Sequence, residues 1–211
     1  MKIVLLHGLF MNSLVMVPMA RRLSQLGWQV QTISYNTVRP NKDSVFAKLD
    51  KAIGQGPTIL VGHSLGGLVI THYLASRQFS TDTIPMVITL GTPHQGAKIV
   101  KDMAKFKLDP ILGTSTQFGL IPQEFAKTWN YPQQLISIAG NVKIGARPIM
   151  DKFLREDIEE SDGTVGVEET EIDGMSKHLV IKQSHMSMLF AKEVPKMIDE
   201  FAREVSKEYS S

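Results

Sequence analysis

Cysteine is absent from the 211 residues of this chain, and its absence excludes both a disulfide framework and a metal site built from thiolates. Because cysteine is absent, the sequence does not indicate whether the protein works in an oxidising or a reducing compartment. An excess of charge of one sign is also lacking, because 23 Lys and Arg against 21 Asp and Glu give a net charge of +2. Neither a nucleic acid nor an anionic membrane surface is therefore predicted as a partner, and we expect no cofactor and no metal.

Long apolar runs, internal repeats and linkers are lacking as well. No stretch is long enough to span a membrane, and the apolar run that follows Met1 is too short for a signal peptide. If Met1 is the native start, the sequence predicts a cytoplasmic protein that does not insert stably into a membrane. Residues 1–211 are expected to form a single domain with a substantial core, and a monomer is the default.

The most informative segment that is present spans residues 58–70. A short apolar, β-branched stretch leads into Gly-His-Ser-Leu-Gly-Gly at residues 62–67, and an apolar helix-forming stretch follows. By itself the pattern would equally fit a turn before an ordinary helix. Between a strand and a helix it predicts a nucleophile elbow, a sharp turn that presents the Ser64 hydroxyl. Glycine is expected at 62 and 66 because side chains there would collide across the turn.

Two backbone amides are candidates for stabilising an oxyanion beside Ser64. The amide of Leu65 lies at a helix N-terminus, where developing negative charge is favoured. The chain opens with a buried strand that ends at His7 and a glycine, similar to the oxyanion loop of lipases and esterases. By that resemblance Leu9 supplies the second amide and Phe10 a pocket wall. The alternative is a strand-ending turn with a structural His7, and the two interpretations are compatible.

A serine nucleophile needs a base, and the chain has six histidines. His185 follows the last predicted strand, and the loops at the carboxyl ends of parallel strands form the active-site face. We therefore predict His185 as the base. His94 follows the predicted strand at 86–90 and is the alternative, with a further candidate role in the substrate pocket. The remaining histidines are His7, His63, which we expect to point away from the site, His72 and His178.

The base also needs an acid that orients it, and several carboxylates lie between the last two predicted strands. Asp162 is the best candidate because it precedes a glycine, and Asp-Gly is a turn signature that would place the carboxylate at the rim of the sheet. We expect an extended run at 164–167 after it. The chain order Ser64, Asp162, His185 is one of the known orders of a Ser-Asp-His triad.

Together these motifs resemble those of a small α/β-hydrolase of the lipase/carboxylesterase group. The segment Gly-Thr-Pro-His-Gln-Gly at 91–96 is similar to triacylglycerol lipases and GPI inositol deacylase-like proteins, in which the histidine of this motif is usually structural. The resemblance implies a minimal α/β-hydrolase fold with a six-stranded, mostly parallel sheet of order 2-1-3-4-5-6. It further implies hydrolysis of carboxylic esters by a triad of Ser64, His185 and Asp162 through an acyl-enzyme.

The apolar pattern alternates between strands and helices, which independently indicates a parallel sheet with helices on both faces. We expect strands at 2–6, 29–34, 58–61, 86–90, 135–139 and 178–182, and helices near 14–26, 43–53, 65–77, 97–106, 123–129 and 193–207. Residues 97–134 are long for a connection and form a candidate cap or lid over the pocket. The alternative for its first part is a surface helix with a solvated lysine face.

Other functions fit the same residues. A thioesterase or an acyltransferase would use the same triad with a different substrate or acceptor, and a non-catalytic acyl-binding or lipid-binding protein would share only the fold. The intact set of Ser64, Asp162 and His185 favours an enzyme. A small-molecule ester or lipid is the expected substrate.

Overall fold

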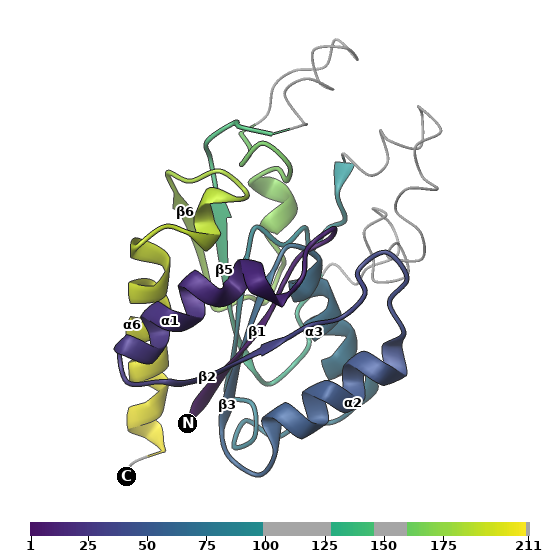
Figure 1. The fold of residues 1–211 in the computed structure, drawn as a ribbon, viewed down its shortest axis with the longest axis vertical. Coiled ribbons are helices and arrows are strands. Elements are labelled where there is room, and N and C mark those ends of the chain that lie inside the picture. The colour runs from purple at the N-terminus through teal and green to yellow at the C-terminus, as the bar shows by residue number, and fades with distance from the viewer. Residues whose placement is uncertain (99–127, 146–159, 210–211) are drawn as a thin grey trace.

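Six parallel strands form one sheet in the computed structural model, which describes residues 1–98, 128–145 and 160–209 (Figure 1). Each strand pairs in parallel with its neighbours in the order β2-β1-β3-β4-β5-β6. The strand order expected from the sequence is therefore confirmed. The bounds are β1 Lys2–Leu6, β2 Gln29–Ile33, β3 Thr58–His63, β4 Met86–Leu90, β5 Gln134–Gly140 and β6 Lys177–Ile181.

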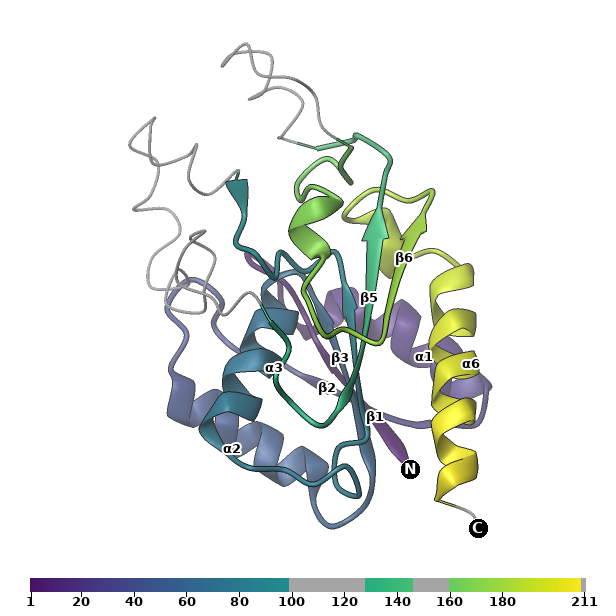
Figure 2. The same cartoon turned by 180° about the vertical axis from the view of Figure 1, so that it is seen from behind.

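Helices cover both faces of this sheet, as Figures 1 and 2 show from opposite sides. On one face lie α1 (Val17–Gln25) and α6 (Glu193–Glu208), and on the other lie α2 (Lys42–Ile53) and α3 (Leu65–Ser76). Three short 3₁₀ turns complete the described elements: η1 at Ser13–Met16, η4 at Glu168–Thr170 and η5 at Ser187–Leu189.

The core is split by the sheet into two layers. Side chains alternate along a strand, so Ile3 and Leu5 pack with α1 and α6, whereas Val4 and Leu6 pack with α2 and α3. All residues of the central strands β3 and β4 are buried, because a parallel sheet covered on both faces has no solvated side. The two edge strands β2 and β6 are more exposed.

Several predicted elements differ from the structure at their ends. The helix expected at 14–26 begins as η1, where the Asn12 side chain accepts a hydrogen bond from the Leu14 amide, before α1 continues it. The helix expected near 123–129 is wrong at its last two residues: Thr128 forms an isolated parallel bridge with Asp173, and the Trp129 amide donates to the Asp173 carbonyl at 2.6 Å. The rest of that helix, the helix near 97–106 beyond residue 98, and most of the candidate cap lie outside the described residues.

Within the described ranges, no helix has the length and the apolar character that crossing a bilayer would demand.

Candidate active site

The predicted site residues gather at the carboxyl edge of the sheet. Ser64 directly follows β3, and Leu9 lies three residues beyond the end of β1. Asp162 lies against the end of β5, since a Cβ built on Gly140 would be 2.9 Å from its Cβ. His185 follows β6 and donates its backbone N–H to the Asp162 carbonyl at 2.8 Å. The edge where ligands bind in open parallel sheets thus carries all the candidates.

Ser64 forms the tight turn between β3 and α3. It is one of two non-glycine residues with positive φ in the described structure, at φ 52° and ψ −121°, a costly conformation that typically marks a functional turn. A Cβ at Gly62 would strike the backbone of Gly67, as the turn requires. The need for glycine at 66 has a different cause: a Cβ there would lie 2.6 Å from the Leu6 carbonyl oxygen of β1.

Asp162 and His185 form a buried pair. The distance between Asp162 Oδ2 and His185 Nδ1 is 2.6 Å, and the two residues are 1% and 6% exposed. A carboxylate accepts only, so this contact places the ring hydrogen on Nδ1 and leaves the Nε2 lone pair free to take a proton. The pair therefore has the arrangement of a base and the acid that orients it.

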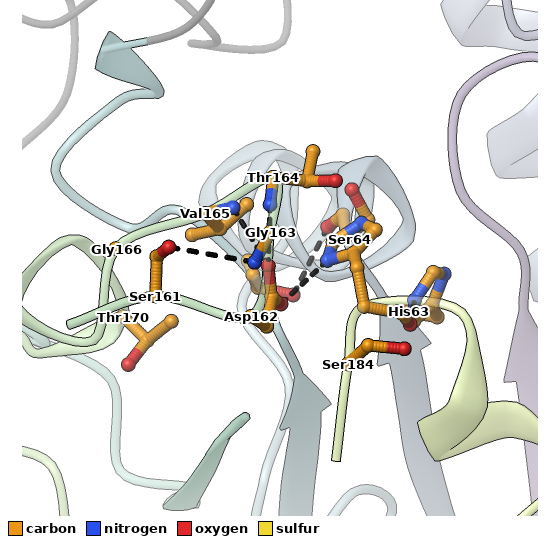
Figure 3. Close-up of polar contacts among 12 residues, drawn as sticks. His63, Ser64, Ser161, Asp162, Gly163, Thr164, Val165, Gly166, Thr170 and Ser184 are labelled. Atoms are coloured by element: carbon orange, nitrogen blue, oxygen red, sulfur yellow. Dashed lines mark hydrogen bonds and ion pairs between the residues drawn. The ribbon is translucent and has the colours of Figure 1, made fainter. Parts of the chain in front are cut away.

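The Asp162 carboxylate is itself held by the loop that follows it (Figure 3). Its Oδ1 accepts hydrogen bonds from the amides of Thr164 at 2.9 Å and Val165 at 2.8 Å. Because the side chain captures these two amides, the chain turns back on itself, and the Asp162 amide reaches the Val165 carbonyl at 3.0 Å. The extended run expected at 164–167 is therefore wrong, and a compact turn stands in its place.

Ser64 lies next to this pair without a hydrogen bond to it. Among the described residues, none joins the Ser64 hydroxyl to the His185 ring, a contact that often forms only when substrate is bound. The adjacent residue makes the connection instead, since His63 Nε2 is 2.9 Å from the His185 carbonyl oxygen. Ser64 is thus linked to His185 through its neighbour in the chain.

The loop after β1 lies against Ser64. A Cβ built on Gly8 would be 3.0 Å from the Cβ of Ser64. The Phe10 amide donates to the Thr37 hydroxyl at 3.0 Å and is therefore not available as a donor to an oxyanion. The Leu9 amide has no hydrogen-bond partner in the part of the chain that the structure describes, and Leu65 occupies the first position of α3, where amides lack intrahelical acceptors. The role of these two amides as an oxyanion hole stays a prediction.

A buried histidine orients the peptide that carries the Leu9 amide. The Tyr35 amide approaches His7 Nε2 at 3.4 Å, so Nε2 bears the lone pair and Nδ1 donates to the Gly8 carbonyl at 3.1 Å. Burial lowers the pKa of His7, which favours this neutral form. A trans peptide points its N–H opposite to its C=O, so fixing the Gly8 carbonyl also fixes the direction of the Leu9 N–H.

His94, the alternative base, has structural surroundings. Its side chain is fully buried, and Nε2 lies 3.0 Å from the Thr89 hydroxyl within the sheet. Burial lowers the pKa of His94 to about 3, so the ring is neutral. Phe10, by contrast, is 57% exposed. The roles of these two residues as pocket walls stay predictions.

Three residues that make contacts in the candidate site were not identified from the sequence. His63 was expected to point away, but it contacts His185. Thr37 accepts a hydrogen bond from the loop after β1. Gly91 packs against the paired side chains, since a Cβ there would lie 2.8 Å from Asp162 Oδ2. Each partner is distant in the sequence, so no local pattern indicates the contact. In the three described ranges, no group of histidine and acidic side chains is suited to hold a metal ion.

The family comparison identifies a match over most of the chain. A family model described as the PGAP1-like alpha/beta domain matches residues 49–199. Curated protein sequences contain no significant match to this chain.

Solved structures resemble this one over nearly its whole length. The mature form of a lipase from Bacillus licheniformis is 24% identical, with a TM-score of 0.67 over 89% of this chain and 86% of that one. A metagenomic carboxyl esterase is 14% identical, with a TM-score of 0.68 over 99% and 76%. A carboxylesterase structure from Nitrososphaera gargenis is 12% identical, with a TM-score of 0.64 over 98% and 91%. At these identities the likeness confirms the expected α/β-hydrolase fold.

Proposed function

Because the chain belongs to the PGAP1-like alpha/beta domain family, we propose that it is a serine hydrolase that cleaves carboxylic esters. The observation that carries this proposal is the 2.6 Å contact between Asp162 and His185, at the sheet edge where Ser64 occupies a strained turn. The fold is shared with a lipase and with carboxylesterases, which supports esters as the substrate class.

The proposed reaction proceeds in two halves through an acyl-enzyme. Ser64 Oγ attacks the ester carbonyl carbon while its proton passes to His185 Nε2. The tetrahedral intermediate then collapses, and the leaving alcohol takes the proton from His185. In the second half a water molecule gives a proton to His185 and attacks the acyl carbon. Collapse returns the proton to Ser64 and releases the carboxylic acid.

The surrounding groups stabilise the charges that develop in these steps. The amides of Leu9 and Leu65 would hold the negative oxygen of each tetrahedral intermediate, each contributing about 3 kcal/mol to lowering the barrier. Asp162 would keep the His185 hydrogen on Nδ1 and stabilise the imidazolium that forms in each half. A neighbour that holds Asp162, such as the Val165 amide, would thereby also support the base.

Hydrolysis of p-nitrophenyl acetate, butyrate, octanoate and palmitate by the purified protein tests the proposal, with Ser64→Ala as the matched control. Turnover that is lost in the control is the expected result. A preference for long chains would support an acyl pocket bounded by the candidate cap at 97–134. A folded protein that neither turns over these esters nor reacts with a fluorophosphonate probe at Ser64 would contradict a serine hydrolase.

A further inference from the structure

His63, the last residue of β3, fills the space between the loop after β1 and the base. Its side chain is fully buried. Its ring centroid lies 4.6 Å from that of His185 at an interplanar angle of 47°, and its Nε2 is 2.9 Å from the His185 carbonyl oxygen. The opposite nitrogen faces Gly8, since a Cβ there would lie 2.9 Å from Nδ1. In Figure 3 it lies on the far side of Ser64 from Asp162.

The contact with a carbonyl determines where the His63 ring carries its hydrogen. A carbonyl oxygen only accepts, so Nε2 donates. Burial, followed by the nearby charge that His185 can carry, lowers the pKa of His63 well below its ordinary value, and the ring is neutral. Nδ1 then holds a lone pair, for which the described residues offer no hydrogen-bond donor.

An unpaired buried nitrogen is unfavourable, and an apolar side chain of similar volume would remove that cost. Packing alone therefore does not account for a histidine at this position. The compensating feature is the hydrogen bond that Nε2 donates, because it reaches the main chain of the residue proposed as the base.

The main chain and the ring of His185 are held at three points. Asp162 provides two of them, by accepting from the His185 amide at 2.8 Å and from Nδ1 at 2.6 Å. His63 provides the third, on the carbonyl. Both contacts of Asp162 lie on one side of His185, and a rotation about them would change the distance from Nε2 to Ser64.

We propose that His63 is a positioning residue: its hydrogen bond to the His185 carbonyl holds the base at a fixed distance from Ser64, the residue that follows His63 in the chain. This inference rests on the proposed function for its effect on turnover. The effect of His63 on the geometry of the His185–Asp162 pair can be measured whether or not the proposed function is correct.

The test compares His63→Leu, which removes the donor, with His63→Gln, whose amide restores an N–H near the position of Nε2. Because misplaced catalytic groups lose rate more than binding, His63→Leu should lower kcat about 10- to 100-fold with KM changed less than about 2-fold. His63→Gln should recover most of kcat. Tyr73→Phe is the matched control: it removes a hydrogen bond of a buried ring to Asp50 far along α3, and should lower stability while leaving kcat unchanged.

The second readout is the NMR resonance of the His185 Nδ1 hydrogen that contacts Asp162. We expect it to shift or broaden in His63→Leu and to return in His63→Gln, whether or not the wild type cleaves esters. An unchanged resonance in His63→Leu, or a His63→Gln variant as slow as His63→Leu, would overturn the inference. If His63→Leu does not fold, His63→Met removes the donor with a more adaptable side chain. A wild type inactive toward both esters and fluorophosphonate would count against the proposed function instead.

Discussion

Replacing Asp162 by asparagine should reverse the direction of the hydrogen bond to the His185 ring. Oδ1 accepts from two backbone amides, those of Thr164 and Val165. In Asp162→Asn the side-chain oxygen must therefore occupy the Oδ1 position, because an amide NH2 group cannot accept. The NH2 group is then directed at His185 Nδ1, where the carboxylate oxygen now lies at 2.6 Å. Nδ1 becomes the acceptor, and the ring hydrogen moves to Nε2.

A His185 ring with its hydrogen on Nε2 cannot take a proton from Ser64. We expect kcat for p-nitrophenyl butyrate to fall about 10⁴-fold, which corresponds to about 5 kcal/mol of barrier. Ser64→Ala should cost more than this. The thermal midpoint of Asp162→Asn should stay close to that of the wild type, because both bonds to Oδ1 are retained. Nitrogen chemical shifts of His185 would report the change of tautomer directly.

An Asp162→Asn variant that keeps more than about a tenth of the wild-type kcat, while the His185 ring hydrogen has moved to Nε2, would show that turnover does not depend on the tautomer. Asp162→Ala provides the comparison. It removes the acceptor for both loop amides and should be less stable, but it leaves the tautomer of His185 free.

Three further results are expected. Ser64→Ala and His185→Ala should each abolish turnover, whereas His94→Ala should cost less; equal losses in folded His94→Ala and His185→Ala proteins would contradict His185 as the base. His7→Phe removes the donor to the Gly8 carbonyl and should lower kcat about 100-fold if the oxyanion loses one amide; a fully active variant would show that the peptide needs no such support. Burial lowers the pKa of His94 to about 3 and that of His63 well below 6.5, so below pH 6.5 the unfolded chain binds protons that the folded chain excludes. Between pH 7 and pH 5 the free energy of unfolding, measured with urea, should fall by about 2 kcal/mol on account of His94, and His63 should lower it further; equal stability at both pH values would be inconsistent with neutral buried rings.

The sequence predicts those features of the molecule that depend on local signals. The central strands are continuous apolar runs, and the turn at Ser64 joins one of them to a helix, so the strand order and the place of this turn follow from pattern and resemblance. The Asp162 loop is different, because its shape depends on a carboxylate that captures two amides instead of leaving them to a strand. The orientation of His63 was predicted wrongly for a related reason: its partner is 122 residues away.

Three buried histidines lie near Ser64, and their hydrogen-bond partners distinguish them: the His185 ring contacts the Asp162 carboxylate, whereas the other two rings contact backbone carbonyls. His7 and His63 each donate from one ring nitrogen to a backbone carbonyl, that of Gly8 and that of His185, and burial lowers the pKa of both. Their neutrality matters because the proposed reaction places a positive charge on His185. A second charged ring at the 4.6 Å separation of His63 would oppose that charge by about 4 kcal/mol at an effective dielectric constant near 20. The burial that costs this protein stability in acid would therefore also lower the barrier of the proposed reaction, because it keeps the rings of His7 and His63 uncharged beside the His185 ring.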